Sequence, residues 1–475
     1  MSSQDHGSAK ADPITKDPAK TIDPQTSTMD EGVLRGEVFD LNKREALERQ
    51  KTLEGETHFS RLGWKRMTVI LIVEAIALGV LSLPKAFASL GMVLGVILCI
   101  SVGLIALYGS VLMAQVQLKH PHVSHYVDLG TLMFGSFGTK LISVFFVGLL
   151  TMVVGSHCLT GAIAFSTIAQ SSSVCSIIFG LVSALIMLLL ALPPSFSEIA
   201  ILGYIDFASI MLAIGITVIG TGVQRSDTDE SHVPWSAWPK EDLNLSEAIV
   251  AINNIVFAYG FAVAQPSFMS EMHTPEDVFK STRALAAIEI IIYTLTGALI
   301  YAFVGQEVQS PALLSIGTTL SRIAFGVALP VILISGAINT TIVSRYIHGR
   351  YYRDSVVRYI NTRKGWISWI VLVCAVTAIA WIVAEAIPFF SELLSICATL
   401  FISGLSFYFP ALMWFILLKD GPWTSKRNII HTLGCGLLFL FGIAIFGFGM
   451  YSSVEALIIK FESGSINRPF TCSRT

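Results

Sequence analysis

The segment from Met67 to Leu90, MTVILIVEAIALGVLSLPKAFASL, is long and apolar enough to cross a bilayer as a helix, yet it contains its own interruption. Gly79, Ser82 and Pro84 lie near its middle, and Glu74 precedes Gly79 by about one turn. Gly and Pro release backbone groups that lipid cannot hydrogen-bond, so such an interruption has to line a cavity or be buried in protein. A carboxyl group inside a span costs about 2.5 kcal/mol or more to insert, which makes Glu74 a candidate functional residue.

The composition is that of a polytopic membrane protein. Hydrophobic residues make up 53% of the chain, charged residues only 13%, and the mean hydropathy is +0.69. Residues 1–66 are polar, and most later charges fall between apolar runs. A net charge of −2 over 475 residues argues against a nucleic-acid partner. The predicted fold class is therefore an all-α polytopic membrane protein.

Eleven apolar segments are long enough to be transmembrane helices. They are 67–89, 92–115, 139–164, 174–192, 199–223, 247–269, 284–304, 322–347, 366–386, 390–418 and 429–451. If the amino terminus is cytoplasmic, the inner loops hold most of the Lys and Arg residues, notably in 348–364 and 419–427. The outer side then offers only Lys85, Arg225, Lys240 and Arg322, plus three basic residues in the carboxyl tail. The positive-inside rule thus predicts an amino terminus inside and a carboxyl terminus outside.

The spans divide the chain into five parts. We expect a disordered cytoplasmic tail at 1–63, a first five-helix repeat at 64–223, and an extracellular loop at 224–246. A second, inverted five-helix repeat follows at 247–418, and 419–475 holds helix 11 and an extracellular tail.

A second interruption lies where an inverted repeat would place it. Span six reads AIVAINNIVFAYGFAVAQPSFMSEM from Ala248 to Met272, with Tyr259-Gly260 in mid-span and Gln265-Pro266 after it. In a five-plus-five architecture, span six is the inverted counterpart of span one. A pair of interrupted spans at matching positions is typical of the binding site of a secondary transporter. Gly and Pro also occur as simple kinks in membrane helices, so each interruption alone has a purely structural reading.

Three stretches resemble the amino acid/auxin permease superfamily. They are GVLSLPKAFASLG at 79–91, FAYGFAVAQPSFMSEM with HTPEDVFKSTR at 257–283, and PFFSELLSICATLFISGLSFYFPALMW at 388–414. The similarity covers roughly residues 60–450, and the nearest branch is the fungal neutral amino acid permeases. It implies a LeuT-like 5+5 inverted repeat with broken helices 1 and 6, and proton-coupled amino acid uptake. One position departs from the pattern: Ala77 stands where many members have Gly.

An α-amino acid needs an acceptor for its carboxylate, one for its ammonium group, and a side-chain pocket. Amides at the start of a half-helix bind a carboxylate, and released carbonyls accept from an ammonium group. We expect the amides from Leu78 to Ser82 and the carbonyls from Ala75 to Ala77 and Phe257 to Tyr259, with Phe257, Tyr259 and Phe261 as pocket walls. The predicted substrate-binding residues are Ala77, Leu78, Gly79, Val80, Leu81, Ser82, Phe257, Ala258, Tyr259, Gly260 and Phe261. Aromatic residues at such positions are also common in plain helix packing.

Coupling to an ion has two candidate mechanisms in this sequence. A buried carboxyl group can take up and release a proton near neutral pH, and the candidates are Glu74 first, then Glu289 and Asp206. A sodium site is the rival, because Gly336, Asn339 and Thr340 share one face of span eight and could supply oxygen ligands. The alternative for these residues is interhelical hydrogen bonding.

The predicted function is proton-coupled import of neutral L-amino acids, aliphatic or aromatic, across the plasma membrane by alternating access. The alternatives are an amino-acid-sensing receptor of the same fold, a vacuolar or other organellar transporter, and a sodium-coupled transporter. Phosphate loops, zinc-ligand spacings and nucleophile elbows are absent from the sequence, so we expect no enzyme, no cofactor and no metal.

Two smaller sequence features concern the predicted outer face. Asn244-Leu-Ser246 is a glycosylation acceptor pattern, but it lies very close to span six. Cys175 and Cys472 both fall near the outer side, and their spacing gives no support for a disulfide. The substrate, the oligomeric state and the stoichiometry are not encoded in these patterns.

Overall fold

A computed structural model describes residues 62–170, 174–194, 196–226, 235–353, 355–462 and 470. The side chains of Glu74, Ala77 and residues 196–201 are outside the described part. The chain divides into Met1–Glu54 and Gly55–Thr475, and all described residues lie in the second unit. The predicted disordered tail therefore falls outside the description, apart from Leu62 and Gly63.

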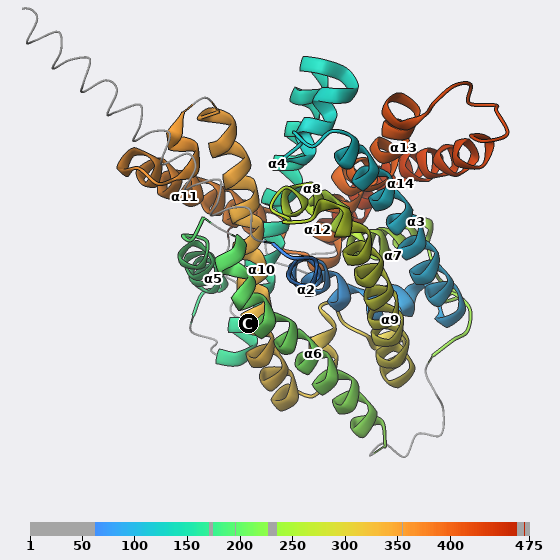
Figure 1. Ribbon diagram of the computed structural model, residues 1–475. Helices are drawn as coiled ribbons and strands as arrows, with labels where there is room; N and C mark the ends of the chain where they lie inside the picture. Colours follow the sequence, from blue (N-terminus) through green and yellow to red (C-terminus); the bar gives the residue numbers. More distant parts are fainter. Residues whose placement is uncertain are drawn as a thin grey trace, which may run out of the picture. The chain divides into compact units, whose positions relative to one another are not determined.

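Long apolar helices make up nearly all of the described chain (Figure 1). The first repeat corresponds to α2 (Trp64–Leu90), α3 (Met92–Lys119), α4 (Tyr126–Ala169), α5 (Ser176–Leu190) and α6 (Phe196–Ser226). The predicted second repeat begins with α7 (Leu245–Ala258), η1 (Gly260–Val263) and α8 (Gln265–Met269), which together form one span. The next three spans are α9 (Val278–Val304), α10 (Thr318–Tyr351) and α11 (Arg363–Ala386). The last span is the run of α12 (Phe390–Cys397), η6 (Ala398–Tyr408), α13 (Phe409–Met413) and η7 (Trp414–Leu418). Helix α14 (Ile429–Glu462) follows.

Each of the eleven predicted spans coincides with one of these helical segments. Within the described residues, eight helices are long and apolar enough to cross a membrane, and the bent α2 makes a ninth. Helices α5 and α7 are shorter apolar helices, and α7 continues through η1 into α8. Lipid offers no hydrogen bonds to a backbone, so an all-helical fold is what a chain of this hydropathy requires.

Helix α2 bends as the sequence predicted, but at least about two turns before Pro84. Its two halves, Trp64–Val73 and Leu78–Leu90, meet at 51°. The amides of Leu78–Ser82 therefore lie in the first turn of the second half, as expected for the start of a half-helix. The bend falls before Gly79, where side chains of other helices reach the carbonyls of Val73 and Ala75, as described below.

The sixth span is interrupted at the predicted residues. Helix α7 ends at Ala258, Tyr259 caps it, and one tight 3₁₀ turn, Gly260–Val263, leads into α8. Pro266 stands at the start of α8, where its missing N–H removes no helical hydrogen bond. Asn244 caps the other end of α7, since its side chain accepts a hydrogen bond from the Glu247 amide at 2.7 Å.

Two local features were not predicted. Helix α4 begins at Tyr126, well before the expected span 139–164, and contains a non-helical turn at Gly135, where φ is 59°. That positive φ suits Gly and lets the chain turn into the span. Cys175, which caps α5, is disulfide-bonded, although its spacing gave no support for a disulfide.

Helix α2 lies among the helices that build the site. It packs against α6, α7, α9 and α10, and its label in Figure 1 lies between those of α8, α9 and α10. A short parallel bridge extends this packing: the Leu62 amide donates to the Glu271 carbonyl at 2.9 Å, and the His273 amide donates to the Leu62 carbonyl at 3.0 Å. The segment before α2 is thus joined to the segment after α8.

Candidate functional site

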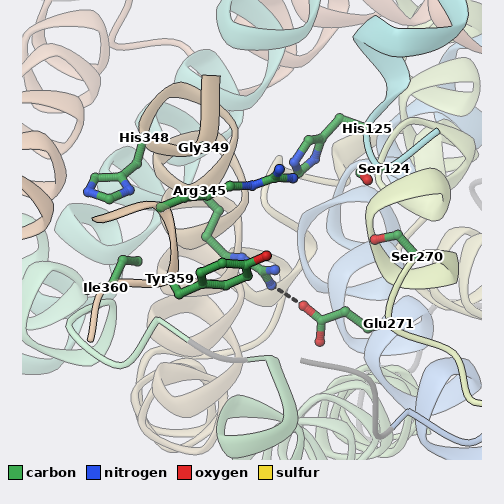
Figure 2. A pocket seen from close by; sticks show the side chains of 10 residues that line it. Ser124, His125, Ser270, Glu271, Arg345, His348, Gly349, Tyr359 and Ile360 are labelled. Atoms are coloured by element: carbon green, nitrogen blue, oxygen red, sulfur yellow. Dashed lines mark hydrogen bonds and ion pairs between the residues drawn. The ribbon is translucent and has the colours of Figure 1, made fainter. Parts of the chain in front are cut away.

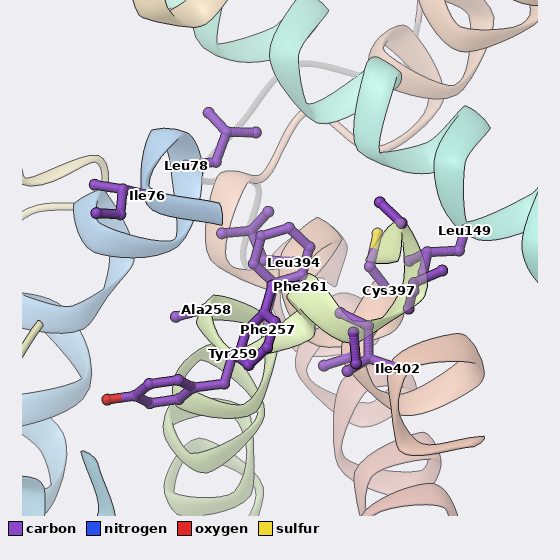
Figure 3. Close-up of a cluster of buried hydrophobic side chains, with 14 of the residues drawn as sticks. Ile76, Leu78, Leu149, Phe257, Ala258, Tyr259, Phe261, Leu394, Cys397 and Ile402 are labelled. Atoms are coloured by element: carbon purple, nitrogen blue, oxygen red, sulfur yellow. The ribbon is translucent and has the colours of Figure 1, made fainter. Parts of the chain in front are cut away.

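A small cavity of about 30 Å³ lies where the two interrupted helices meet. Six of the predicted substrate residues line it: Leu78, Gly79, Phe257, Ala258, Gly260 and Phe261. Ala75, Leu149, Leu150, Val153, His157, Val263 and Ile402 complete its wall. Figure 3 shows several of these side chains gathered with Leu394 and Cys397. A space of this size holds about one water molecule, so the site is closed around itself.

Glycine lets the two interrupted helices approach each other at the cavity. A Cβ atom on Gly79 would lie only 2.7 Å from the Ala258 Cα atom, so the backbones are in direct contact there. A Cβ atom on Gly260 would meet the Ile402 side chain at 2.7 Å. The first clash is with backbone and the second with the end of a flexible side chain, so Gly79 is the more restricted position.

Four predicted substrate residues do not line the cavity, and one lies outside the described side chains. Val80, Leu81 and Ser82 are buried in α2, where the Ser82 hydroxyl donates to the Gly79 carbonyl at 2.8 Å. Tyr259 points away from Phe257 and Phe261 (Figure 3). Its ring instead contacts the Tyr293 ring edge-on, with centroids 5.1 Å apart. Only the backbone of Ala77 is described.

Tyr293 on α9 connects the two interruptions. Its hydroxyl oxygen lies 2.8 Å from the Ala75 carbonyl oxygen of α2 and 3.1 Å from the Ala258 carbonyl oxygen of α7. These are the kinds of released carbonyls that were expected to receive a substrate ammonium group. Because a hydroxyl carries one proton, Tyr293 serves one carbonyl fully or both weakly. The sequence gave no signal for Tyr293, since its partners lie far away along the chain.

A second cross-helix contact holds the first half of α2. The Ser335 hydroxyl of α10 lies 2.9 Å from the Val73 carbonyl oxygen and 3.2 Å from Asp206 Oδ2 of α6. Asp206 is fully buried, and its Oδ1 has no hydrogen-bond partner among the described residues. The carboxyl group predicted as a third coupling candidate is therefore one hydroxyl away from the bend in α2.

The structure says less about the other two acidic candidates, Glu289 and Glu74. Glu289 is fully buried on α9, one helical turn before Tyr293. Glu289 is not among the residues that line the central cavity. The side chain of Glu74 is outside the described part of the chain, so its prediction stays a prediction.

The candidate cation residues of span eight do not gather toward α2. The Thr340 hydroxyl donates to the Gly336 carbonyl at 2.9 Å, and the Asn339 amide donates to the Ser335 carbonyl at 3.1 Å, so both bond within α10. A Cβ atom on Gly336 would meet Met187 of α5 and His157 of α4. The Asn339 Oδ1 atom, which a cation would use, has no hydrogen-bond partner among the described residues, so the cation site stays a prediction. The Ser335 hydroxyl of α10 reaches α2. Among the residues the structure describes, no group of three or more His, Cys, Asp or Glu residues could hold a metal ion.

Comparisons with known proteins agree with this geometry. Residues 60–455 match the family described as transmembrane amino acid transporter protein. The chain belongs to that family. It is 52% identical over 462 residues to the N amino acid transport system protein of Neurospora crassa, covering 96% of this chain and 98% of that one. It is 21% identical to amino acid permease 2 of Arabidopsis thaliana, covering 86% of this chain and 92% of that one. The protein is thus an amino acid transporter and not an enzyme.

Two solved structures confirm the predicted fold of the transporter. The nucleobase-cation-symport-1 family transporter Mhp1, in a closed conformation with bromovinylhydantoin bound, gives a TM-score of 0.53 at 12% identity, covering 85% of this chain and 93% of that one. MhsT in complex with L-phenylalanine gives a TM-score of 0.52 at 12% identity, covering 81% of this chain and 98% of that one. The LeuT-like architecture with interrupted first and sixth helices is therefore confirmed.

A polar cavity of about 360 Å³ lies at the predicted cytosolic end of the transporter (Figure 2). Glu271, just after α8, forms an ion pair there with Arg345 of α10. His125, which caps α4, lies 3.1 Å from the Ser267 hydroxyl. Burial is the main cause that lowers the pKa of His125 to about 4, and the nearby Arg345 charge adds to this. His125 is therefore neutral at cytosolic pH.

Another cavity of about 360 Å³ lies at the predicted outer end. Two ion pairs border it: Lys240 with Glu247 at 2.6 Å and Lys460 with Glu392 at 2.6 Å. Lys85 of α2 also lines it. Two larger cavities therefore flank the small central one, one at each predicted end of the transporter.

Proposed function

We propose that this transporter imports neutral L-amino acids together with protons, across the plasma membrane, by alternating access. The neutral preference is supported by the central cavity, whose described lining contains no charged side chain. The Neurospora crassa relative is an amino acid transport system protein, and MhsT binds L-phenylalanine. Both are consistent with neutral amino acids as substrates. An apolar wall with backbone carbonyls suits an amino acid whose side chain carries no charge.

The proposed coupling rests on one observation, the position of Ser335 between Asp206 and the Val73 carbonyl. A serine hydroxyl has a single proton to donate. When Asp206 is ionised, its carboxylate draws that proton, because hydrogen bonds to ionised groups are roughly twice as strong as neutral ones. The Val73 carbonyl then loses its partner.

Protonation of Asp206 reverses this arrangement. A protonated carboxyl group can donate to the Ser335 oxygen, which frees the Ser335 proton for the Val73 carbonyl. The first half of α2 is then held against α10 at its bend. Proton binding would thus favour the closed arrangement, and proton release would free the half-helix to move. The protonation state of Asp206 on α6 is thereby linked to the conformation of α2. The link is the Ser335 hydroxyl, which donates either to Asp206 or to the Val73 carbonyl.

Removal of the Asp206 charge tests this proposal directly. In proteoliposomes, Asp206→Asn should lose accumulation of labelled substrate driven by an inward proton gradient. Exchange of labelled for unlabelled substrate should persist, because exchange needs only the loaded carrier to reorient. The matched control is Glu289→Gln, which neutralises another fully buried acid without touching Ser335. It should keep the wild-type pH dependence.

The competing assignments give different results in the same assay. If Asp206→Asn concentrates substrate with the wild-type pH profile, proton coupling at Asp206 is wrong, and Glu74→Gln and Glu289→Gln identify the coupling acid. If replacing external sodium with choline stops wild-type uptake at every pH, the transporter is sodium-coupled. Binding without uptake in sealed vesicles would instead support the receptor alternative, and imaging of the tagged protein separates plasma membrane from vacuole.

A further inference from the structure

A groove of about 840 Å³ opens between the end of α10 and the first half of α11. Its α10 side is formed by Ile347, His348, Tyr351 and Tyr352, and its α11 side by Arg363, Lys364, Ile367, Ser368, Val371, Leu372 and Ala375. The groove is separate from the central cavity and takes no part in the coupling proposed above.

The apolar part of this groove fits within one lipid leaflet. On α11, Ile367, Val371 and Ala375 follow one another at helical spacing, so they form one stripe. The eight steps from Ile367 to Ala375, at 1.5 Å each, give a stripe of about 12 Å, which is less than half of a ~30 Å hydrocarbon core. Ile367 is 56% and Val371 64% exposed, so no helix of the described chain covers the stripe.

The polar end of the groove is positively charged. Arg363 and Lys364 are both exposed, and neither forms an ion pair with any described residue. The described residues that line the groove include no Asp or Glu. Both basic residues occupy the first turn of α11, where the helix dipole also favours a negative group. Charge complementarity therefore calls for an anion at this end.

Exposed aromatic residues indicate where the basic end of the groove lies relative to the membrane surface. Tyr351 is 79% exposed and Trp366 42% exposed at the same end of the two helices. Exposed Tyr and Trp are typical of the membrane–water interface. The basic end therefore lies at headgroup level, and the apolar stripe runs from it into the bilayer.

We propose that this groove binds one anionic glycerophospholipid, with its phosphate at Arg363 and Lys364 and an acyl chain along Ile367, Val371 and Ala375. Basic pockets between transmembrane helices on the cytosolic side are known to suit such headgroups. The bound lipid would bridge α10 and α11, reinforcing the contact between His348 Nε2 and the Ser368 hydroxyl at 2.9 Å. His348 also lines the cavity that holds the Glu271–Arg345 ion pair, so the lipid would sit next to the predicted cytosolic closure.

Native mass spectrometry of the full-length protein, titrated with phosphatidylserine or phosphatidylcholine, tests the proposal. Phosphatidylserine should be retained at least about tenfold more strongly. Arg363→Gln combined with Lys364→Gln should weaken it about 30-fold, or about 2 kcal/mol, since each basic residue near an anionic surface contributes about 1 kcal/mol. The matched control, Lys426→Gln with Arg427→Gln, removes another adjacent exposed basic pair outside the groove and should bind as wild type.

Two further arms separate a lipid site from other causes. Ala375→Trp should fill the exposed stripe and reduce phosphatidylserine retention while leaving both basic residues in place. Glycerophosphoserine, which has the headgroup without acyl chains, should not compete at concentrations that saturate with lipid. Equal retention of phosphatidylcholine, unchanged binding in Arg363→Gln with Lys364→Gln, full competition by glycerophosphoserine, or an equal loss in Lys426→Gln with Arg427→Gln would each overturn the proposal.

Discussion

The two interrupted helices differ in how the backbone groups at the interruption are hydrogen-bonded. At the α2 bend, the carbonyls of Val73 and Ala75 accept hydrogen bonds from the side chains of Ser335 and Tyr293 on other helices. At the second interruption, the Ala258 carbonyl shares the Tyr293 hydroxyl, and the chain then turns through Tyr259 and the tight turn Gly260–Val263 into α8. The difference lies in Ser335, which joins the α2 bend to the carboxyl group of Asp206.

This difference separates two tasks. The α2 bend touches a buried acid through Ser335, so it is suited to sense protonation. The α7–α8 turn presents Phe257 and Phe261 to the cavity, so it is suited to select the substrate side chain. The following predictions test this division, and they run from the largest expected effect to the smallest.

The largest effect should come from the glycines at the two interruptions. Gly79→Leu and Gly260→Leu should both abolish uptake while membrane insertion persists. The smaller Gly79→Ala should still lower uptake at least tenfold, because its Cβ meets the Ala258 backbone, and overpacking costs about 1–3 kcal/mol. Gly260→Ala should lose much less, because the Ile402 side chain can move. Radiolabelled uptake, normalised to protein in the membrane, measures both, and equal losses in the two Ala variants would contradict the comparison.

The next effect concerns the hydroxyl between Asp206 and α2. Ser335→Ala removes the group that links them, so accumulation should fall several-fold and the pH dependence of uptake should flatten. Thr340→Ala serves as the control on the same helix, because its hydroxyl bonds only within α10. A steep pH profile in Ser335→Ala, or loss of uptake in Thr340→Ala with restoration by high sodium, would favour the cation site instead.

A smaller effect is expected at Tyr293. Tyr293→Phe leaves the Ala75 and Ala258 carbonyls without this donor, and an unsatisfied buried acceptor costs about 1–3 kcal/mol. Substrate ammonium can replace the lost donor, so the variant should lose thermal stability that added substrate restores. Tyr301→Phe removes a hydroxyl from the same helix, where its partners are Ser236 and Gln306, and substrate should not rescue it. Differential scanning fluorimetry with and without substrate distinguishes the two variants.

The smallest effect on transport should come from His125. Its pKa of about 4 in the folded protein lies below the ordinary value of 6.5, so the unfolded state binds a proton first as the pH falls. His125 therefore costs stability below about pH 6.5, increasingly down to about pH 4, and His125→Gln should melt at higher temperature than wild type in that window. Its uptake-versus-pH curve between pH 5 and 8 should match wild type, and a shifted curve would place coupling at the predicted cytosolic end.

The sequence was sufficient for features that depend on local chemistry. Gly79, Gly260 and Pro266 mark interruptions because Gly and Pro change the backbone wherever they stand, and both interruptions were found at or near them. Hydropathy likewise predicted the helical segments. Tyr259 was placed wrongly in the pocket wall, although its spacing from Phe257 was a warning: residues two apart in a helix face different directions.

The contacts that complete the site could not be predicted in this way. Tyr293 lies 218 residues from Ala75, and Ser335 lies 129 residues from Asp206. Their pairing is set by how whole helices pack, and a lone hydroxyl in an apolar segment looks the same whether it bonds its own helix or another. Thr340 and Ser335 illustrate this, since both carry a hydroxyl on α10 and of the two only Ser335 reaches α2.

The backbone bridge between Leu62 and Met272 joins the two interrupted helices in a way that tolerates changes of amino-acid sequence. Its two hydrogen bonds use only backbone groups of Leu62, Glu271 and His273. Almost any residue could replace Leu62 without losing them, and proline is the exception because it has no N–H to donate. The entry to α2 and the exit from α8 are therefore tied by a link that side-chain substitution cannot easily cut. Related chains can keep this link while sharing no residue identity at these positions.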